Sequence, residues 1–134
     1  MIETHSERFA RLATLGDNIL ELLMYHQPIA IVCESPFFNS KRPQAFAALV
    51  EATNMIRQAV WNYDHSINLN LVDPPSVKQA VNAKGNAGKE DVQKAVLAIS
   101  ELNYHGFPPL SSLDEHSIDA IAVAYSKLIN YRQP

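Results

Sequence analysis

A short apolar run between two long amphipathic segments constrains the fold of this chain most strongly. Residues 29–33, IAIVC, are rich in β-branched side chains, which is typical of a strand covered on both faces in a parallel sheet. Residues 3–26 and 43–62 repeat apolar side chains at helical spacing, which predicts a helix on each side of the strand. Pro28 ends the first helix, since proline cannot donate a helical hydrogen bond.

The rest of the chain predicts a second strand and further helices. Residues 66–72, SINLNLV, alternate apolar and polar side chains, as a half-exposed strand does. A helical turn at 77–81, a loop at 82–88, a helix from about 89 and a last helix to about 130 follow. Before the last helix, Ser112 and Glu115 match a capping box, whose side chains satisfy free amide groups of the first turn. The order predicts an α/β protein with a single domain over 1–134.

Two strands are few for a parallel sheet. Such a pair is rarely stable alone, because so small a sheet cannot bury both of its faces. We therefore expect further strands upstream of Met1, or strands that a partner chain supplies.

Charge and composition limit the function classes. The net charge is −3, the opposite of the basic footprint of many nucleic-acid binders, so any DNA contact must come from a local basic patch. Cys33 is the only cysteine, which excludes an internal disulfide and a cysteine-based metal site. No signal-peptide core or membrane-spanning stretch is present in the sequence. We expect a soluble protein of the cytoplasm, with no membrane partner.

Glu34 is the first candidate site residue. It follows five apolar residues at the carboxyl end of the expected strand, which is where ligands bind in open α/β sheets. A carboxylate there is costly to bury unless it is paired or bound to a metal. The alternative is a solvated strand-end glutamate, which the pattern by itself favours.

His116 and Asp119 form the second candidate. They stand three residues apart on the last helix and therefore share a face, from which they could ligate a metal beside Glu34. That face continues into small and apolar residues expected to pack against the sheet: Ala120, Val123 and Ala124. The acids Asp114 and Glu115 are explained well by the helix dipole alone, which favours negative charge at a helix start.

The third candidate is a lysine-rich loop in residues 74–96. Lys78, Lys84, Lys89 and Lys94 surround a loop that contains Gly85 and Gly88. Backbone amides beside lysines can hold a phosphate, although most basic loops are only solvated.

These segments together resemble the RuvC family of Holliday junction endonucleases. In 74–96 a Val-Lys pair precedes a glycine-containing loop, a Lys and a Val-Gln, so Lys78 and Lys89 keep the family's spacing; Ala83 replaces the first loop glycine and Gly85 fills the second position. The run DEHSIDAIAVAYSKL matches the family's last helix, with Asp119 as its Asp and His116 at the preceding position, where the family has Asp or His. Glu34 matches the strand-end Glu, and Phe37 the aromatic inserted at the junction.

The resemblance implies an RNase H-like fold and a homodimer that cuts branched DNA in recombination and repair, in a bacterial or phage-infected cell. Two Mg²⁺ ions, or Mn²⁺, would be held by Glu34, His116 and Asp119, with Lys89 completing the catalytic set. DNA contacts would come from Phe37, its neighbour Phe38, Lys78, Lys84, Lys89 and Arg42. The residues 44–62 are the expected dimer contact.

One departure from the family concerns its first catalytic aspartate. The family begins with a strand that carries this residue, and nothing in the sequence corresponds to it. We therefore expect the 134-residue chain to be incomplete at its N-terminus and to cut poorly by itself. Two alternatives remain open: a non-catalytic RNase H-like module for DNA binding or assembly, and a nuclease for other branched DNA.

Overall fold

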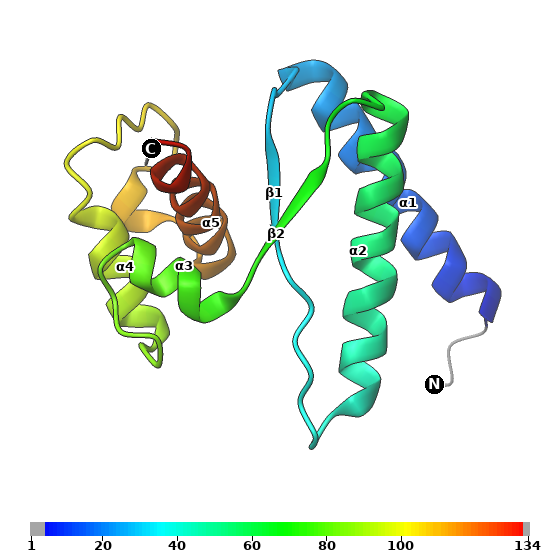
Figure 1. The fold of residues 1–134 in the computed structure, drawn as a ribbon, viewed down its shortest axis with the longest axis horizontal. Coiled ribbons are helices and arrows are strands. Elements are labelled where there is room, and N and C mark those ends of the chain that lie inside the picture. The colour runs from blue at the N-terminus through cyan, green and yellow to red at the C-terminus, as the bar shows by residue number, and fades with distance from the viewer. Residues whose placement is uncertain (1–4, 133–134) are drawn as a thin grey trace. The chain divides into compact units, whose positions relative to one another are not determined.

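The computed structural model describes residues 5–132, which form two compact units divided between Leu71 and Val72. The ribbon in Figure 1 shows the first unit as two long helices with a small sheet, and the second as a cluster of shorter helices. None of the helices within 5–132 is long and apolar enough to cross a membrane. The expectation of one domain over 1–134 stays a prediction.

The first unit has a parallel βαβ arrangement preceded by a helix. Helix α1 (His5–His26) leads to strand β1 (Ile31–Glu34), helix α2 (Pro43–Tyr63) and strand β2 (Leu69–Val72), whose last residue falls beyond the division between units. The strands β1 and β2 are hydrogen-bonded neighbours that run in the same direction. These elements confirm the predicted helix–strand–helix–strand order.

The core of this unit lies where α1, α2 and the sheet meet. Leu23, Ala59 and Val60 are buried there, and Ile31 and Leu69 pack against them from the two strands. Arg8 and Glu51 join α1 to α2 by two hydrogen bonds of 2.9 and 3.1 Å. Part of the apolar face predicted for each helix therefore lies in one shared core, whereas Phe9 and Leu22 of α1 are 65% and 53% exposed.

Both strands are shorter than the sequence indicated. The first begins at Ile31 and extends through Glu34, while Ile29 is 92% exposed. Gln27 has a positive φ of 50°, so the chain turns around Gln27 and Pro28 before it can become extended. The second begins at Leu69, because Asp64 accepts hydrogen bonds from the backbone and hydroxyl of Ser66 and holds that residue in a turn.

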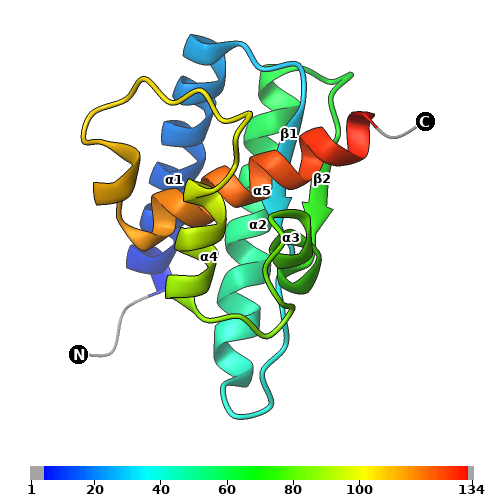
Figure 2. The same cartoon turned by 90° about the vertical axis from the view of Figure 1, so that its left-hand side faces the viewer.

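The second unit packs two short helices on a long one. Helices α3 (Pro74–Ala80) and α4 (Lys89–Leu97) contact α5 (Glu115–Arg132), and a short 3-10 helix η1 (Leu110–Ser112) precedes α5. Figure 2 shows α3 and α4 lying against α5. The buried side chains of this unit come from the three helices and the segment between α3 and α4: Val77, Val81, Ala87, Val92, Val96, Ile118, Ala122, Val123 and Ser126.

Helix α5 buries a different face from the one expected. Ile118, Ala122 and Ser126, four residues apart, are each 2% exposed or less, whereas Ala120 and Ala124 are exposed. The expected core face of Ala120, Val123 and Ala124 is therefore wrong except at Val123, which is 8% exposed. The reason is that α5 packs against α3 and α4, and the side of α5 that contacts them carries Ile118 and Ala122.

The helix start also differs from the capping box expected at Ser112 and Glu115. The helix begins at Glu115, so Asp114 occupies the N-cap and Ser112 lies in η1. The Ser117 hydroxyl donates to the Asp114 carboxylate, and this hydrogen bond holds the pKa of Asp114 below its usual value. A capping interaction is present, but it begins two residues later than predicted.

Candidate functional site

The N-termini of α4 and α5 bring three predicted site residues into one corner of the second unit. Lys89 is the first residue of α4 and Glu115 the first of α5, and the Lys89 Nζ lies 2.5 Å from Glu115 Oε2. This hydrogen bond raises the pKa of Lys89, to which the negative charge of Asp119 adds a smaller contribution. The same bond lowers the pKa of Glu115. We call Lys89, Glu115, His116 and Asp119 the paired corner.

His116 and Asp119 are both presented to solvent. The His116 side chain is 85% exposed, with its Nε2 3.7 Å from Glu115 Oε1, and Asp119 is exposed one turn further along the helix. Their spacing predicted a shared face, and both lie off the buried face of Ile118 and Ala122. An imidazole and a carboxylate are therefore available as ligands on one side of α5.

Glu34 is the last residue of β1 in the first unit and is exposed. Its neighbour Cys33 is half-buried; burial raises the pKa of the Cys33 thiol, and the charge of Glu34 raises it further. Within residues 5–132 no group of three or more His, Cys, Asp or Glu side chains is gathered for a metal ion. The set of Glu34, His116 and Asp119 therefore stays a prediction.

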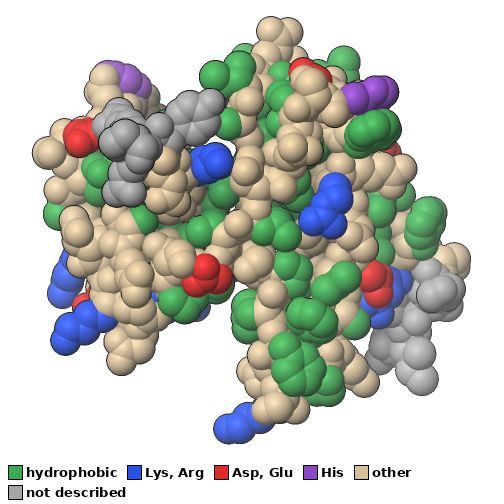
Figure 3. Space-filling model, viewed as in Figure 1, with side chains coloured by type: hydrophobic (Ala, Val, Ile, Leu, Met, Phe, Trp, Pro, Cys, Tyr) green, Lys and Arg blue, Asp and Glu red, His purple; other side chains and the backbone are tan. Residues whose placement is uncertain are grey.

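The loop between β1 and α2 carries the aromatic candidates and Arg42. Phe37 and Phe38 are 55% and 64% exposed. The Phe38 ring packs edge-on against Phe46 of α2, with centroids 5.7 Å apart, while Arg42 is exposed at the N-cap of α2. Figure 3 shows hydrophobic side chains gathered over this loop and the adjoining end of α2. The segment between β1 and α2 thus presents two exposed aromatic rings and an exposed arginine.

The lysine loop is held by a Schellman motif at the end of α3. The backbone N–H of Ala83 donates to Lys78 O at 2.8 Å and that of Asn82 to Gln79 O at 3.0 Å, the two bonds that define this motif. Asn82 has the positive φ, 64°, and none of the glycines in the described residues does. The turn needed at this point therefore comes from an asparagine, one residue before the family's first loop glycine.

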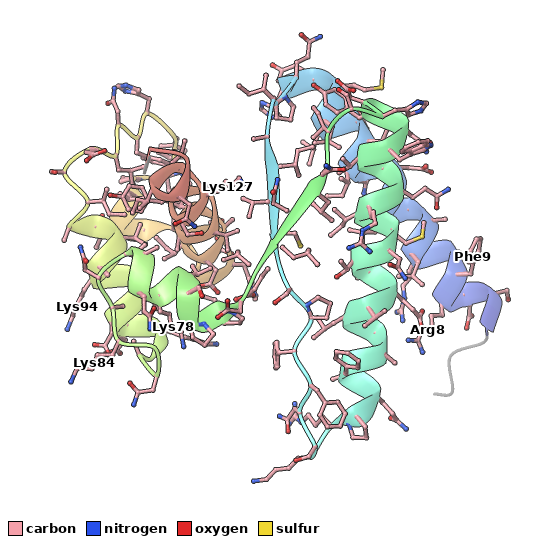
Figure 4. The ribbon with its side chains drawn as sticks, viewed as in Figure 1. Arg8, Phe9, Lys78, Lys84, Lys94 and Lys127 are labelled. Carbon is pink, nitrogen blue, oxygen red and sulfur yellow. The ribbon has the colours of Figure 1, made fainter. Side chains whose placement is uncertain are left out.

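Three further lysines, Lys78, Lys84 and Lys94, lie around this loop, and no ion pair within residues 5–132 involves them. Lys78 is half-buried in the last turn of α3, and Lys84 and Lys94 are exposed. Figure 4 shows Lys84 and Lys94 projecting to the same side of the unit. Sequence reasoning placed Lys94 among the lysines around this loop but did not name it as a DNA contact, and it assigned Glu115 to a capping box and the helix dipole. It did not predict that Glu115 pairs with Lys89.

Comparison with known proteins identifies the family. The family model described as crossover junction endodeoxyribonuclease RuvC matches residues 1–127. A protein of that name from Moorella thermoacetica is 32% identical over 123 residues, which are 92% of this chain and 70% of the relative. The chain belongs to the RuvC family.

Other RuvC proteins support the same assignment. Two from Dehalococcoides mccartyi are 29% and 30% identical over 115 residues, and the chain spans 64% and 63% of their length. The solved Thermus thermophilus RuvC structure matches with a TM-score of 0.66 at 23% identity, covering 98% of this chain and 75% of that one. This likeness confirms the expected α/β, RNase H-like fold.

Proposed function

We propose that the chain supplies the metal-ligating and DNA-contacting part of a RuvC endonuclease, which hydrolyses phosphodiesters at four-way DNA junctions in recombination and repair. The observation that supports the proposal is the paired corner of a family member: Lys89 and His116 both contact Glu115 where α4 and α5 begin, and Asp119 follows one turn later. The resemblance predicts Lys89, His116 and Asp119 as site residues. Membership of the family supports the reaction type, and the geometry of the paired corner supports the choice of residues.

The donor set suits a divalent cation. Mg²⁺ prefers oxygen ligands in octahedral geometry, and Glu34 and Asp119 are exposed carboxylates with His116 three residues before the second of them. We assign these three residues as ligands of Mg²⁺ or Mn²⁺. When two ions are bound, they lower the pKa of the attacking water and stabilise the leaving oxygen.

Other residues hold the DNA. The Lys89 ammonium would bind a phosphate near the ligands and favour negative charge that develops there, but Glu115 competes for it at 2.5 Å. Phe37 would stack on an unpaired base at the branch, a contact of about 1–3 kcal/mol per base in single-strand binders. Phe38, braced against Phe46, supports it. Lys78, Lys84 and Arg42 would contact phosphates.

We further propose a homodimer, because cutting opposite strands of a junction requires two sites. The residues 44–62 of α2 are the proposed contact, and Leu49 and Trp61 on this helix are 37% and 58% exposed. Light scattering at micromolar concentration should give twice the mass of the chain, and Trp61→Glu should shift it to the monomer.

The test of the metal assignment combines Mn²⁺ titration with junction binding. Glu34→Gln and Asp119→Asn should each weaken Mn²⁺ binding about tenfold or more, since even groups that support a ligand are worth 10–100-fold, and should leave four-way junction binding unchanged. Asp17→Asn, on α1, is the matched control. Equal Mn²⁺ affinity in all variants would contradict the ligand assignment. Loss of junction binding and Mn²⁺ binding together would indicate misfolding.

A second function is favoured by one observation. Lys89 is engaged by Glu115 at 2.5 Å, so its charge is already paired within the protein, as expected for a junction-binding module without catalysis. Such a module would bind four-way junctions and show no Mn²⁺ site that depends on Asp119.

A further inference from the structure

A hollow on the second unit lies between the α3–α4 loop and the first turns of α4. Lys84 and Asn86 line it from the loop, Asn82 from the end of α3, and Asp91 and Lys94 from α4, around a space of about 660 Å³. Its lining begins at the Schellman motif around Asn82 and continues into α4, about ten residues later in the sequence. The hollow is distinct from the paired corner, since neither Lys89 nor α5 lines it.

The charges in this hollow are not balanced by the protein. Lys94 stands four residues after Glu90, the order that best favours a helical ion pair, yet among residues 5–132 no ion pair joins Lys94 to Glu90 or Asp91. Lys84 likewise has no ion-pair partner in that range. Two ammonium groups thus face one hollow that holds a single carboxylate, on a chain whose net charge is −3.

A bound anion would offset the excess positive charge of this lining. The lining supplies ammonium donors at Lys84 and Lys94 and amide donors at Asn82 and Asn86, a combination typical of contacts to phosphate oxygens along a nucleic-acid backbone. No aromatic side chain lines the hollow, so it offers nothing on which a base could stack. The chemistry therefore fits the backbone of a duplex and not an unpaired strand.

We propose that Lys84 and Lys94 form a second DNA contact, separate from the paired corner, that holds the phosphate backbone of a duplex arm of the branched substrate. This inference rests on the proposed function and deepens it by assigning one part of the substrate to one surface. The contact adds affinity without touching the cleavage site. It should therefore affect duplex and junction binding alike, and not Mn²⁺ binding.

The test is the salt dependence of DNA binding by the intact chain, measured with a four-way junction and with linear duplex of the same arm sequence. Each phosphate contact contributes about 0.9 to the slope of log affinity against log salt, which corresponds to about five- to tenfold in affinity near 0.1 M salt. Lys84→Gln and Lys94→Gln should each lose about that much for both DNAs. Lys127→Gln, which removes the same charge from α5 on another side of the unit (Figure 4), is the control.

The possible outcomes distinguish a failure of this inference from a failure of the proposed function on which it rests. If the wild-type chain binds no DNA, the proposed function and this inference both fail. If it binds the junction while Lys84→Gln and Lys94→Gln match Lys127→Gln in affinity and slope, only the second contact is wrong. Loss of junction binding with duplex binding unchanged would also overturn it, because a backbone contact cannot distinguish the two. Circular dichroism of each variant verifies the helix content.

Discussion

The two lysine surfaces of the second unit differ in one respect that their sequence does not show. At the paired corner Lys89 is bound by Glu115 at 2.5 Å, with Asp119 near enough to raise its pKa further. At the hollow, Lys84 and Lys94 have no ion-pair partner in residues 5–132. At the paired corner the lysine ammonium is held by a carboxylate. At the hollow the two lysine ammonium groups are available to bind an anion.

The difference indicates that nearness to a proposed catalytic position and availability of a lysine for phosphate binding are separate properties. A phosphate that approaches Lys89 must displace or share the Glu115 carboxylate. One that approaches the hollow meets two ammonium groups and two side-chain amides against the single carboxylate of Asp91. We therefore expect the hollow to supply initial affinity, because a phosphate at the corner would have to compete with Glu115 for Lys89.

The largest expected effect is a loss of stability in α4, the helix that contributes to both the paired corner and the hollow. Val96 is fully buried on α4, the helix that carries Lys89 and Lys94. Val96→Ala should lower the free energy of unfolding by about 2 kcal/mol, because it removes buried methyl groups and leaves a cavity. Urea denaturation measures this. Leu97→Ala is the control next to it, since Leu97 is 43% exposed; an equal loss in both variants would contradict the packing described for α4.

The next effect sharpens the contrast at the paired corner. Glu115→Gln removes the carboxylate that occupies Lys89, so DNA affinity should rise about fivefold and the salt slope should grow by about 0.9. Fluorescence anisotropy with a labelled junction measures both. Glu90→Gln removes the same charge from an exposed position on α4, and it should raise the DNA affinity less than Glu115→Gln does. If both variants bind alike, net charge accounts for the gain and Lys89 is not released by losing Glu115.

The smallest effect is the pH dependence of the Lys89–Glu115 bond. The bond lowers the folded-state pKa of Glu115 from its usual 4.5, so its contribution to stability is present above the unfolded pKa and is lost as pH falls through the folded pKa. The difference in melting temperature between wild type and Glu115→Gln should be constant above about pH 5 and shrink toward pH 3. In a Lys89→Gln background, the difference in melting temperature with and without Glu115→Gln should not change with pH. If it still shrinks toward pH 3, the pH dependence does not come from the Lys89–Glu115 bond.

Much of the fold follows from the sequence because its signals are local. Apolar spacing predicted α1, α2 and α4, and the β-branched run before Glu34 predicted β1. The boundaries depended on contacts that spacing does not contain: the turn at Gln27 delays β1, and the carboxylate of Asp114, accepting from Ser117, moves the start of α5 past Ser112. On α5 the packing of α3 and α4 chose Ile118 and Ala122 over Ala120 and Ala124.

The sequence predicted which residue types form the candidate site and their order along the chain, but not which of them pair in space. Lys84, Lys89 and Lys94 are equivalent lysines in the sequence, and the structure separates them because Glu115 reaches one and the hollow receives the other two. Such pairing depends on where α4 and α5 begin in space, which no spacing rule gives. The aromatic loop was simpler: Phe37 and Phe38 follow a strand directly and are both exposed.

The most direct test of the central claim is competition binding of the intact 134-residue chain between a four-way junction and linear duplex of the same arm sequence, at two salt concentrations. The account predicts preference for the junction of about tenfold or more, with affinity for both DNAs falling steeply as salt rises. Equal affinity for junction and duplex, or binding that salt leaves unchanged, would contradict it.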